Sequence, residues 1–238
     1  MSELMFQKDS YVKEFDCKII KVDEDENAVV LDRTAFYIGG GGQPCDTGTL
    51  KTKTDVYIVT KVKKKGQDVY HYIDGKLPEI NETCIGKIDW EHRYKLMRTH
   101  TAMHILCGVV WRDYKAKVTG GDMDCLKGRL DFEFENFHKE LIAEIEDKIN
   151  REVEYKRNIS VNILQREEAF KIPDLIRTKI NLLPEGITEI RTVNIEGLDL
   201  QADGGTHVKN TEEVGKIKIA DYKSKGKLNK RIYIELEE

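Results

Sequence analysis

The chain has 238 residues, of which 39% are hydrophobic and 34% charged, which excludes a disordered or fibrous protein and leaves room for two ordinary domains. No stretch approaches the roughly 20 apolar residues of a membrane span, and the N-terminal residues carry no secretory apolar run, so we expect a cytoplasmic protein without a membrane partner. The formal net charge of -4 disfavours indiscriminate nucleic-acid binding, and five scattered cysteines without a CxxC pair disfavour a disulfide framework or a thiolate-only zinc site.

The first 86 residues are predicted to form a small β-barrel domain. Residues 18–32 alternate apolar and polar side chains around an acidic turn, which indicates a hairpin. Further alternating segments lie at 53–63 and 68–75, and glycine-rich breakers such as GGGGQPCDTG separate the strands. Short strands at this spacing favour a barrel.

The pattern changes to helical spacing at Asp89, and residues 90–114 predict the longest helix of the chain. The elements predicted after it are, in order, a glycine-rich turn (118–122), a strand (128–134), an amphipathic helix (138–156), a strand (159–165), a short helix (166–172), a strand (188–197) and a hairpin (214–225 and 230–238). Residues 87–238 are therefore predicted to form a second domain of the α+β class, with helices packed on a mostly antiparallel sheet.

Two of the six histidines, His100 and His104, stand four residues apart on the predicted long helix. Side chains at this spacing project from one helix face, so two imidazoles can bind one metal ion. A packed or capping pair shows the same spacing, so both interpretations stay open. A zinc peptidase is disfavoured, because Thr101, Ala102 and Met103 stand where the peptidase motif carries a general-base glutamate.

A third histidine, His207, lies in the segment LQADGGTHV at residues 200–208. A catalytic zinc ion takes three protein ligands and keeps one open position. The three histidines could supply these ligands, with Asp203 or Gln201 as an oxygen donor; the alternative for this segment is an ordinary glycine turn with a surface histidine. Neutral imidazoles would leave the ion its full double charge, which favours ester hydrolysis.

Four segments together resemble the editing domain of alanyl-tRNA synthetase and its freestanding AlaX-type relatives. They follow the family's order and approximate spacing over nearly the whole chain: LDRTAFYIGGGGQPCDTG (31–48), HTAMHIL (100–106), GRLDF (128–132) and DGGTHV (203–208). The resemblance implies a barrel like those of translation factors, followed by an editing domain with one zinc ion. It also implies an aminoacyl-tRNA deacylase that acts on tRNA(Ala) mischarged with serine or glycine, and no obligate protein partner is evident.

The resemblance also implies roles for single residues. His100, His104 and His207 would be zinc ligands. Thr119 looks like the threonine that lines the family's amino-acid pocket and favours the serine hydroxyl, and we expect Gln43 and Asp203 to act with it in catalysis. The other expected substrate contacts are an arginine of the third segment and the glycine motif, which in the family approaches the metal pocket: Arg129, Gly39, Gly40, Gly41 and Gly42.

The chain departs from the family at Asp203. The family commonly has CGGTH, with its cysteine as a fourth zinc ligand. An aspartate oxygen is a harder donor on a different stem. Asp203 is therefore either the fourth ligand or a neighbour of a three-histidine site, and Cys107 is either a substitute donor or a buried thiol.

A freestanding editing protein has to hold tRNA by its own surface. Candidate phosphate contacts are the basic segments at 216–231 and 61–65, and Lys87, Arg93, Lys95 and Arg98 near the start of the long helix. A solvated hairpin is the alternative for the first segment. Two other functions stay open: editing of a different aminoacyl-tRNA, since threonyl-tRNA synthetase carries a related domain, and a non-enzymatic RNA-binding module with a structural zinc. The FYIGGGGQ segment favours the alanyl branch.

Overall fold

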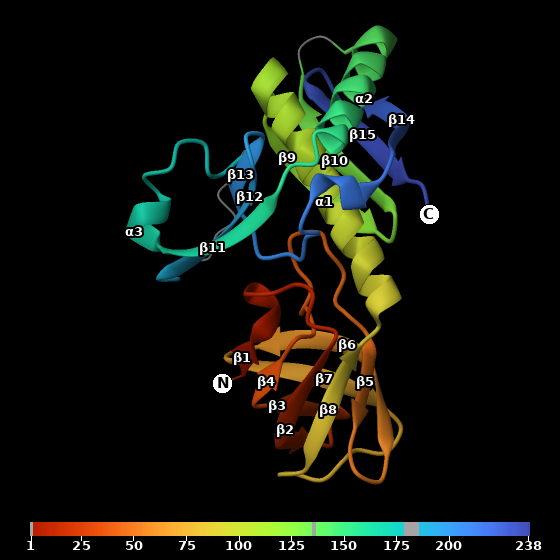
Figure 1. Ribbon diagram of the computed structural model, residues 1–238, viewed down its shortest axis with the longest axis vertical. Helices are drawn as coiled ribbons and strands as arrows, with labels where there is room; N and C mark the ends of the chain where they lie inside the picture. Colours follow the sequence, from red (N-terminus) through yellow and green to blue (C-terminus); the bar gives the residue numbers. More distant parts are fainter. Residues whose placement is uncertain (1, 135–136, 179–185) are drawn as a thin grey trace. The chain divides into compact units, whose positions relative to one another are not determined.

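The computed structural model describes residues 2–134, 137–178 and 186–238. The chain divides into two compact units, Met1–Tyr94 and Lys95–Glu238. Helix α1 (Trp90–Tyr114) begins in the first unit and continues in the second (Figure 1). Within the described ranges, no helix is both long and apolar enough to cross a membrane. The domain boundary predicted between residues 86 and 87 stays a prediction.

The first unit is built around a closed barrel of six antiparallel strands in the order β2-β3-β7-β6-β5-β8. Their bounds are Glu14–Asp23 (β2), Ala28–Leu31 (β3), Gly48–Lys51 (β5), Val56–Lys65 (β6), Asp68–Asp74 (β7) and Thr83–Ile88 (β8). Beside the barrel, β1 (Glu3–Leu4) pairs in parallel with β4 (Arg33–Thr34), and a 3-10 turn, η1 (Met5–Gln7), follows β1. The predicted barrel is confirmed.

The barrel is filled by apolar side chains, because alternate positions of each strand face its interior. Ile19, Leu31, Leu50 and Val59 have no exposed surface. His71 is also fully buried, with its Nε2 2.8 Å from the Thr34 hydroxyl, and burial lowers the pKa of this imidazole to about 4. The histidine is therefore a neutral part of the packed interior.

A buried ion pair joins Asp46, in the glycine-rich segment, to Arg93, in the first turn of α1. Both side chains have 0% exposure. Arg93 Nε lies 2.8 and 3.0 Å from the two carboxylate oxygens, and the guanidinium also donates to the carbonyls of Ser10 (2.9 Å) and Ala35 (2.7 Å). The prediction that Arg93 contacts phosphate is therefore wrong, because its guanidinium has no exposed surface and is committed to these partners.

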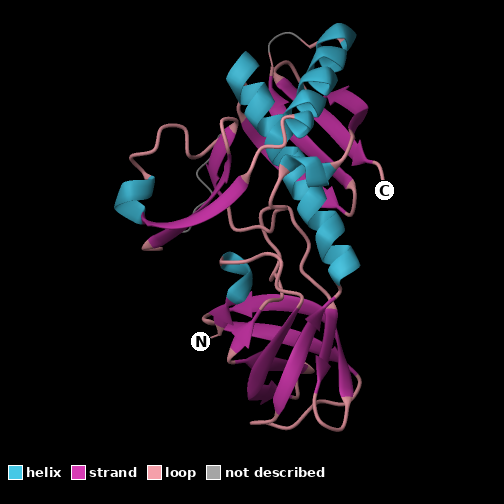
Figure 2. Cartoon of the chain, viewed as in Figure 1, coloured by secondary structure: helices cyan, strands magenta, loops and turns pink. Residues whose placement is uncertain are grey.

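The second unit contains two antiparallel sheets, a four-stranded sheet β14-β15-β10-β9 and a three-stranded sheet β11-β12-β13 (Figure 2). The remaining elements of the unit are β9 (Val118–Asp124), β10 (Lys127–Glu133), α2 (Lys139–Glu154), β11 (Ile159–Gln165), α3 (Arg166–Ala169), β12 (Glu189–Ile195), β13 (Asp199–Ala202), η2 (Thr211–Val214), β14 (Ile217–Ser224) and β15 (Asn229–Leu236). Helix α2 is fastened to β14 by Asn150, whose side chain bonds both the amide (2.9 Å) and the carbonyl (2.7 Å) of Ile217. The predicted α+β class is confirmed.

The segment VTGGD is predicted as a turn, and here the prediction is wrong: these residues form the first part of β9. Glycine stands at position 121 because of close packing. A Cβ atom there would lie 2.9 Å from Leu130 Cδ2 and 3.4 Å from Met103 Cε of helix α1. A glycine inside a strand often marks such a close approach, and turn propensity alone does not reveal it.

Candidate metal centre

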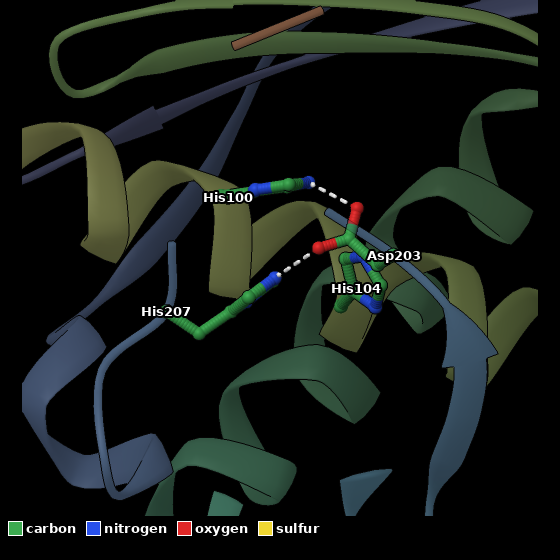
Figure 3. A group of neighbouring side chains, drawn as sticks. All are labelled: His100, His104, Asp203 and His207. Carbon is green, nitrogen blue, oxygen red and sulfur yellow. Dashed lines mark hydrogen bonds and ion pairs between the residues drawn. The ribbon is translucent and has the colours of Figure 1, made fainter. Parts of the chain in front are cut away.

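Four candidate metal ligands converge from two parts of the second unit. His100 and His104 project from one face of α1, and Asp203 and His207 lie in the loop that follows β13 (Figure 3). The histidine residues are buried, at 3–8% exposure, and the Asp203 side chain is 14% exposed. The helix and the loop therefore place the three predicted histidines and Asp203 together.

The loop takes its shape from Asp203. The carboxylate Oδ2 accepts the backbone N–H of Gly205 at 2.7 Å, which is an Asx turn. Arg191 of β12 is linked to the same residue twice, since its guanidinium donates to the Asp203 carbonyl (2.9 Å) and its carbonyl accepts the Asp203 N–H (3.1 Å). These bonds hold the carboxylate toward the histidines.

The donor atoms of the four residues lie close to one another. Asp203 Oδ2 is 3.0 Å from His207 Nε2, and Asp203 Oδ1 is 3.6 Å from His100 Nε2. One donor atom from each of the four residues, His104 included, falls within 4.8 Å of all the others. The imidazoles of His100 and His207 are stacked, with ring centroids 4.3 Å apart.

Burial controls the charge of this group. Desolvation, with repulsion from the other imidazoles, holds the pKa of His100 well below its usual value and lowers that of His207 to about 4. Burial also acts on His104, but a hydrogen bond to Asp199 and the negative charges of Asp203 and Asp199 together outweigh it and raise the pKa. Burial would raise the pKa of Asp203, yet the charges of His100 and His207 and a hydrogen bond from His207 hold it well below its usual value. The site thus gathers three imidazoles, of which His100 and His207 have a lowered pKa, around an ionised carboxylate.

These donors fit zinc in kind, and two of their separations fit its geometry. Zinc binds imidazole nitrogen and carboxylate oxygen at about 2.0–2.2 Å in a tetrahedron, whose edges are then about 3.3–3.6 Å. The two measured separations, 3.0 and 3.6 Å, are close to such edges. The group meets the requirements of a metal site with respect to donor type, donor number and burial.

Two of the histidines are also bonded through the nitrogen that faces away from the group. His207 Nδ1 is 3.1 Å from the hydroxyl of Thr101, which also accepts the N–H of Val208 at 3.3 Å. His104 Nδ1 is 3.0 Å from Asp199 Oδ2. Sequence reasoning missed Thr101 and Asp199. Their position beside the HxxxH pair and the GGTH segment was the only signal, and it does not tell which side chains turn toward the imidazoles.

Cys107 is a buried thiol outside this group of donors. Its Sγ accepts an N–H from Gln201 at 3.4 Å, and burial raises the pKa of the thiol. Gln201 in turn donates to Asp199 at 2.6 Å. Gln201 and Cys107, the two alternative donors considered from the sequence, therefore contact each other beside His104. These contacts join neither of them to the Asp203 carboxylate.

Thr119 and Arg129 lie on the four-stranded sheet. Thr119 is exposed on β9, and its hydroxyl donates to Asn229 Oδ1 at 3.0 Å. Arg129 on β10 forms ion pairs with Asp122 (3.7 Å) and Asp131 (3.6 Å). None of these contacts joins them to the histidine group, and their role in binding substrate stays a prediction.

The glycine motif belongs to the first unit and is a tight hairpin loop. Gly40 and Gln43 exchange two backbone hydrogen bonds of 3.0 Å, and the Tyr37 hydroxyl donates to the Gly40 carbonyl at 3.0 Å. Gly41 and Gly42 at the tip have φ values of 60° and 91°, a conformation that L side chains rarely adopt. Gln43 is buried at 2% exposure. The loop therefore has a defined shape, and its catalytic role stays a prediction.

Comparison with known proteins identifies the class of protein to which this fold and these donors belong. Residues 190–233 match the family model of the second additional domain of threonyl and alanyl tRNA synthetases. Residues 6–92 match the model of class II (A) tRNA synthetases. The matches fall in both units, so the chain is related to synthetase sequence on either side of the histidine pair.

Full-length relatives give the family. An alanyl-tRNA editing protein, AlaX-M, of Saccharolobus solfataricus is 40% identical over 237 residues, which is 98% of each chain. The protein of the same name from Methanosarcina barkeri is 38% identical over 99% of each chain. An alanine–tRNA ligase of Ignicoccus hospitalis is 38% identical over 90% of this chain but only 24% of the ligase. The chain belongs to the family of alanyl-tRNA editing proteins, which are aminoacyl-tRNA deacylases.

Proposed function

We propose that this protein is a trans-editing hydrolase that removes serine, and also glycine, from mischarged tRNA(Ala) by zinc-dependent ester hydrolysis in the cytoplasm. The observation that carries the proposal is the buried group of His100, His104, His207 and Asp203 in a chain that matches editing proteins from end to end. The related ligase matches over only 24% of its own length, which agrees with an editing activity that forms one part of the ligase.

We assign one zinc ion to the three histidines, with Asp203 as the fourth donor. When bound, zinc would supply a positive charge that polarises an ester carbonyl. The protein residues would hold that charge in place: the imidazoles offer nitrogen donors, and the Asp203 carboxylate is oriented by Gly205 and Arg191. Because an aminoacyl ester is already activated, the site has no need of a covalent nucleophile.

Selection of serine is assigned to Thr119. A pocket that bonds the serine hydroxyl loses that bond when alanine enters and leaves a polar group unpaired, which discriminates more strongly than shape does. The Thr119 hydroxyl already donates one hydrogen bond, to Asn229 Oδ1. Gln43 and the glycine loop are assigned to the positioning of the aminoacyl end.

The basic hairpin of β14 and β15 is assigned to the tRNA backbone. Lys223, Lys225 and Lys227 are exposed there, and Asp221 is the acidic side chain that pairs with Lys223, at 3.1 Å. Duplex RNA is recognised largely by shape and backbone, so a modest local excess of positive charge is sufficient on a protein of net charge -4. Arg98 is less suited to this task, because it donates to the carbonyls of Val214 and Glu237.

The test offers tRNA(Ala) charged with serine, glycine or alanine to the purified protein, before and after chelation and after zinc is restored. We expect hydrolysis of the seryl and glycyl esters, protection of the alanyl ester, and loss of activity with the metal. Hydrolysis that survives chelation, or equal rates on serine and alanine, contradicts the proposal.

The same assay separates the alternatives. Preference for a tRNA other than tRNA(Ala) would indicate the threonyl branch, which shares the family model of residues 190–233. Retained tRNA binding with no hydrolysis, together with unfolding when the metal is removed, would indicate an RNA-binding module with a structural zinc.

A further inference from the structure

A buried carboxylate, Asp199, stands behind the proposed metal site. It is the first residue of β13 and is 3% exposed. Its Oδ2 lies 3.0 Å from His104 Nδ1 and accepts an N–H from Gln201 at 2.6 Å. Asp199 does not belong to the group of four donors, whose own carboxylate is Asp203.

The helix is shaped to admit this carboxylate. Gly108 is four residues after His104 on α1, so it lies on the same helix face one turn further along. A Cβ atom at Gly108 would lie 2.9 Å from Leu198 Cγ and 3.0 Å from Asp199 Cβ. A glycine inside a helix costs about 1 kcal/mol relative to alanine, and here it lets the β12–β13 turn reach the imidazole.

A buried cation faces the other side of the carboxylate. Arg177 Nε lies 3.8 Å from Asp199 Oδ1, and the guanidinium sits 5.0 Å from the centre of the Trp111 ring. A carboxylate without exposed surface needs such a countercharge, because desolvation would otherwise disfavour its ionised form. Asp199 is thus held by the hydrogen bond from Gln201, by the charge of Arg177 and by close packing against Gly108.

We propose that Asp199 is a positioning residue that holds His104 in the tautomer with the proton on Nδ1. The Nδ1–H donates to Asp199, and the lone pair of Nε2 is then presented to the group formed with His100, His207 and Asp203. A carboxylate behind a ligating imidazole orients the ring and raises its basicity, and its loss typically weakens metal binding by about 10–100-fold. This inference rests on the zinc site of the proposed function.

The test measures zinc binding and not only activity. Asp199→Ala removes the carboxylate, and Gly108→Ala displaces it. Asp199→Asn keeps an oxygen that can accept the Nδ1–H. We expect zinc affinity, measured by competition with a chromophoric chelator, to fall about 10–100-fold in the two alanine variants and less in the asparagine variant. In the metal-free protein, at a pH where His104 is neutral, 15N NMR should show its single proton on Nδ1, and a single proton on Nε2 contradicts the proposal.

A matched control is Asp131→Ala, which removes another buried carboxylate of the same unit, paired with Arg231 at 2.6 Å. Its zinc affinity should equal that of the unchanged protein. Unchanged affinity in Asp199→Ala, or an equal loss in Asp131→Ala, overturns the inference while leaving the zinc site intact. Absence of zinc binding by the unchanged protein overturns the proposed function as well.

A different observation, in the barrel, concerns two thiols. Cys17 of β2 and Cys84 of β8 are directly opposite partners in the strand register, and their sulfur atoms are 3.3 Å apart. Opposite residues of antiparallel strands have Cα atoms about 4.5–5.5 Å apart, which lies inside the range that a disulfide spans. Both cysteines line a surface pocket of about 710 Å³, together with Lys18 and Lys51.

We propose that Cys17 and Cys84 are a site of disulfide formation by hydrogen peroxide. The hydrogen bond from Cys17 lowers the pKa of the Cys84 thiol, which favours Cys84 as the attacking thiolate. Two S–H bonds break and one S–S bond forms, and the peroxide takes up two electrons and two protons to give two molecules of water. The bond would tie β2 to β8, the strand that leads into α1.

The test treats the folded, purified protein with hydrogen peroxide and maps its peptides by mass spectrometry. We expect a Cys17–Cys84 linked peptide pair lighter by two hydrogens, and a melting temperature raised on the order of 5–10 °C. The pair should persist in a Cys45→Ser, Cys125→Ser double variant and disappear in Cys17→Ser and in Cys84→Ala. Oxidation of Cys125 without a Cys17–Cys84 link overturns the proposal.

Discussion

The carboxylate of Asp46 and the guanidinium of Arg93 form an ion pair that is closed to solvent on both sides. Asp46 also accepts the N–H of Tyr37 at 2.5 Å and donates its own N–H to the Tyr37 carbonyl at 3.0 Å. Asp46 therefore joins the two ends of the glycine loop and links the loop to the first turn of α1. Such a pair fixes a conformation, whatever its net effect on stability.

Asp46→Ala should destabilise the protein strongly, because it leaves the Arg93 charge buried without its partner. Removal of one member of a buried pair costs about 3–5 kcal/mol in free energy of unfolding. Denaturant titration followed by circular dichroism measures the loss. In the double variant with Arg93→Met, part of the stability should return. A loss below 1 kcal/mol, typical of an exposed pair, would contradict the buried geometry.

Asp203 provides the second prediction. Asp203→Asn keeps the size of the side chain and removes its charge, so zinc affinity should fall by more than the roughly 100-fold typical of residues behind the ligands. Asp203→Cys supplies a thiolate, which is also a zinc donor, and should retain zinc. Equilibrium dialysis with zinc analysis measures both. Asp221→Asn, on the exposed hairpin, is the control, and an Asp203→Asn variant that binds like this control would place Asp203 outside the ligand set.

The proposed role of Thr119 is tested by removing its hydroxyl. Thr119→Val keeps the shape and should lower kcat/KM on seryl-tRNA(Ala) by about 10-fold, the value of one to two hydrogen bonds, while glycyl-tRNA(Ala) and bound zinc stay unchanged. Asn229→Ala is the matched control, since it removes the partner of the hydroxyl and leaves the hydroxyl itself. Equal selectivity in Thr119→Val and the unchanged protein would refute the assignment.

Gly121 tests the contact between β9 and helix α1. Gly121→Val should cost about 1–3 kcal/mol of unfolding free energy, because its side chain would meet Leu130 and Met103. Gly204→Val is a control at an exposed glycine whose Cβ would have no neighbour within 4 Å. Thermal unfolding of the two variants gives the comparison, and equal melting temperatures would contradict the packing described here.

The sequence predicts much of this fold because long, regular patterns are local. The helix at 90–114 and the terminal hairpin follow from periodicity, and the structure places both there. VTGGD and Arg93 were mispredicted because their environment is set by distant residues: Met103 and Leu130 make Gly121 a packing residue, and Asp46 buries Arg93. Local pattern does not encode such contacts.

The residues of the candidate site likewise divide into those that the sequence predicts and those that it does not. Spacing and resemblance name His100, His104 and His207, and the structure brings these three together. Asp199 and Thr101 escape sequence reasoning, because a side chain that supports an imidazole is defined by direction and not by motif. Asp199 becomes a neighbour of His104 because β13 packs against α1, and Thr101 becomes a neighbour of His207 because the loop after β13 does so.

With Asp203 as the carboxylate of the group, the four donors are a set of nitrogen and oxygen atoms only. A thiolate ligand is the atom of a zinc site that peroxide attacks, and its conversion to sulfenic acid or a disulfide releases the ion. Nitrogen and carboxylate donors have no counterpart to this reaction. The proposed zinc site should therefore resist oxidants that would disarm a site with a thiolate ligand.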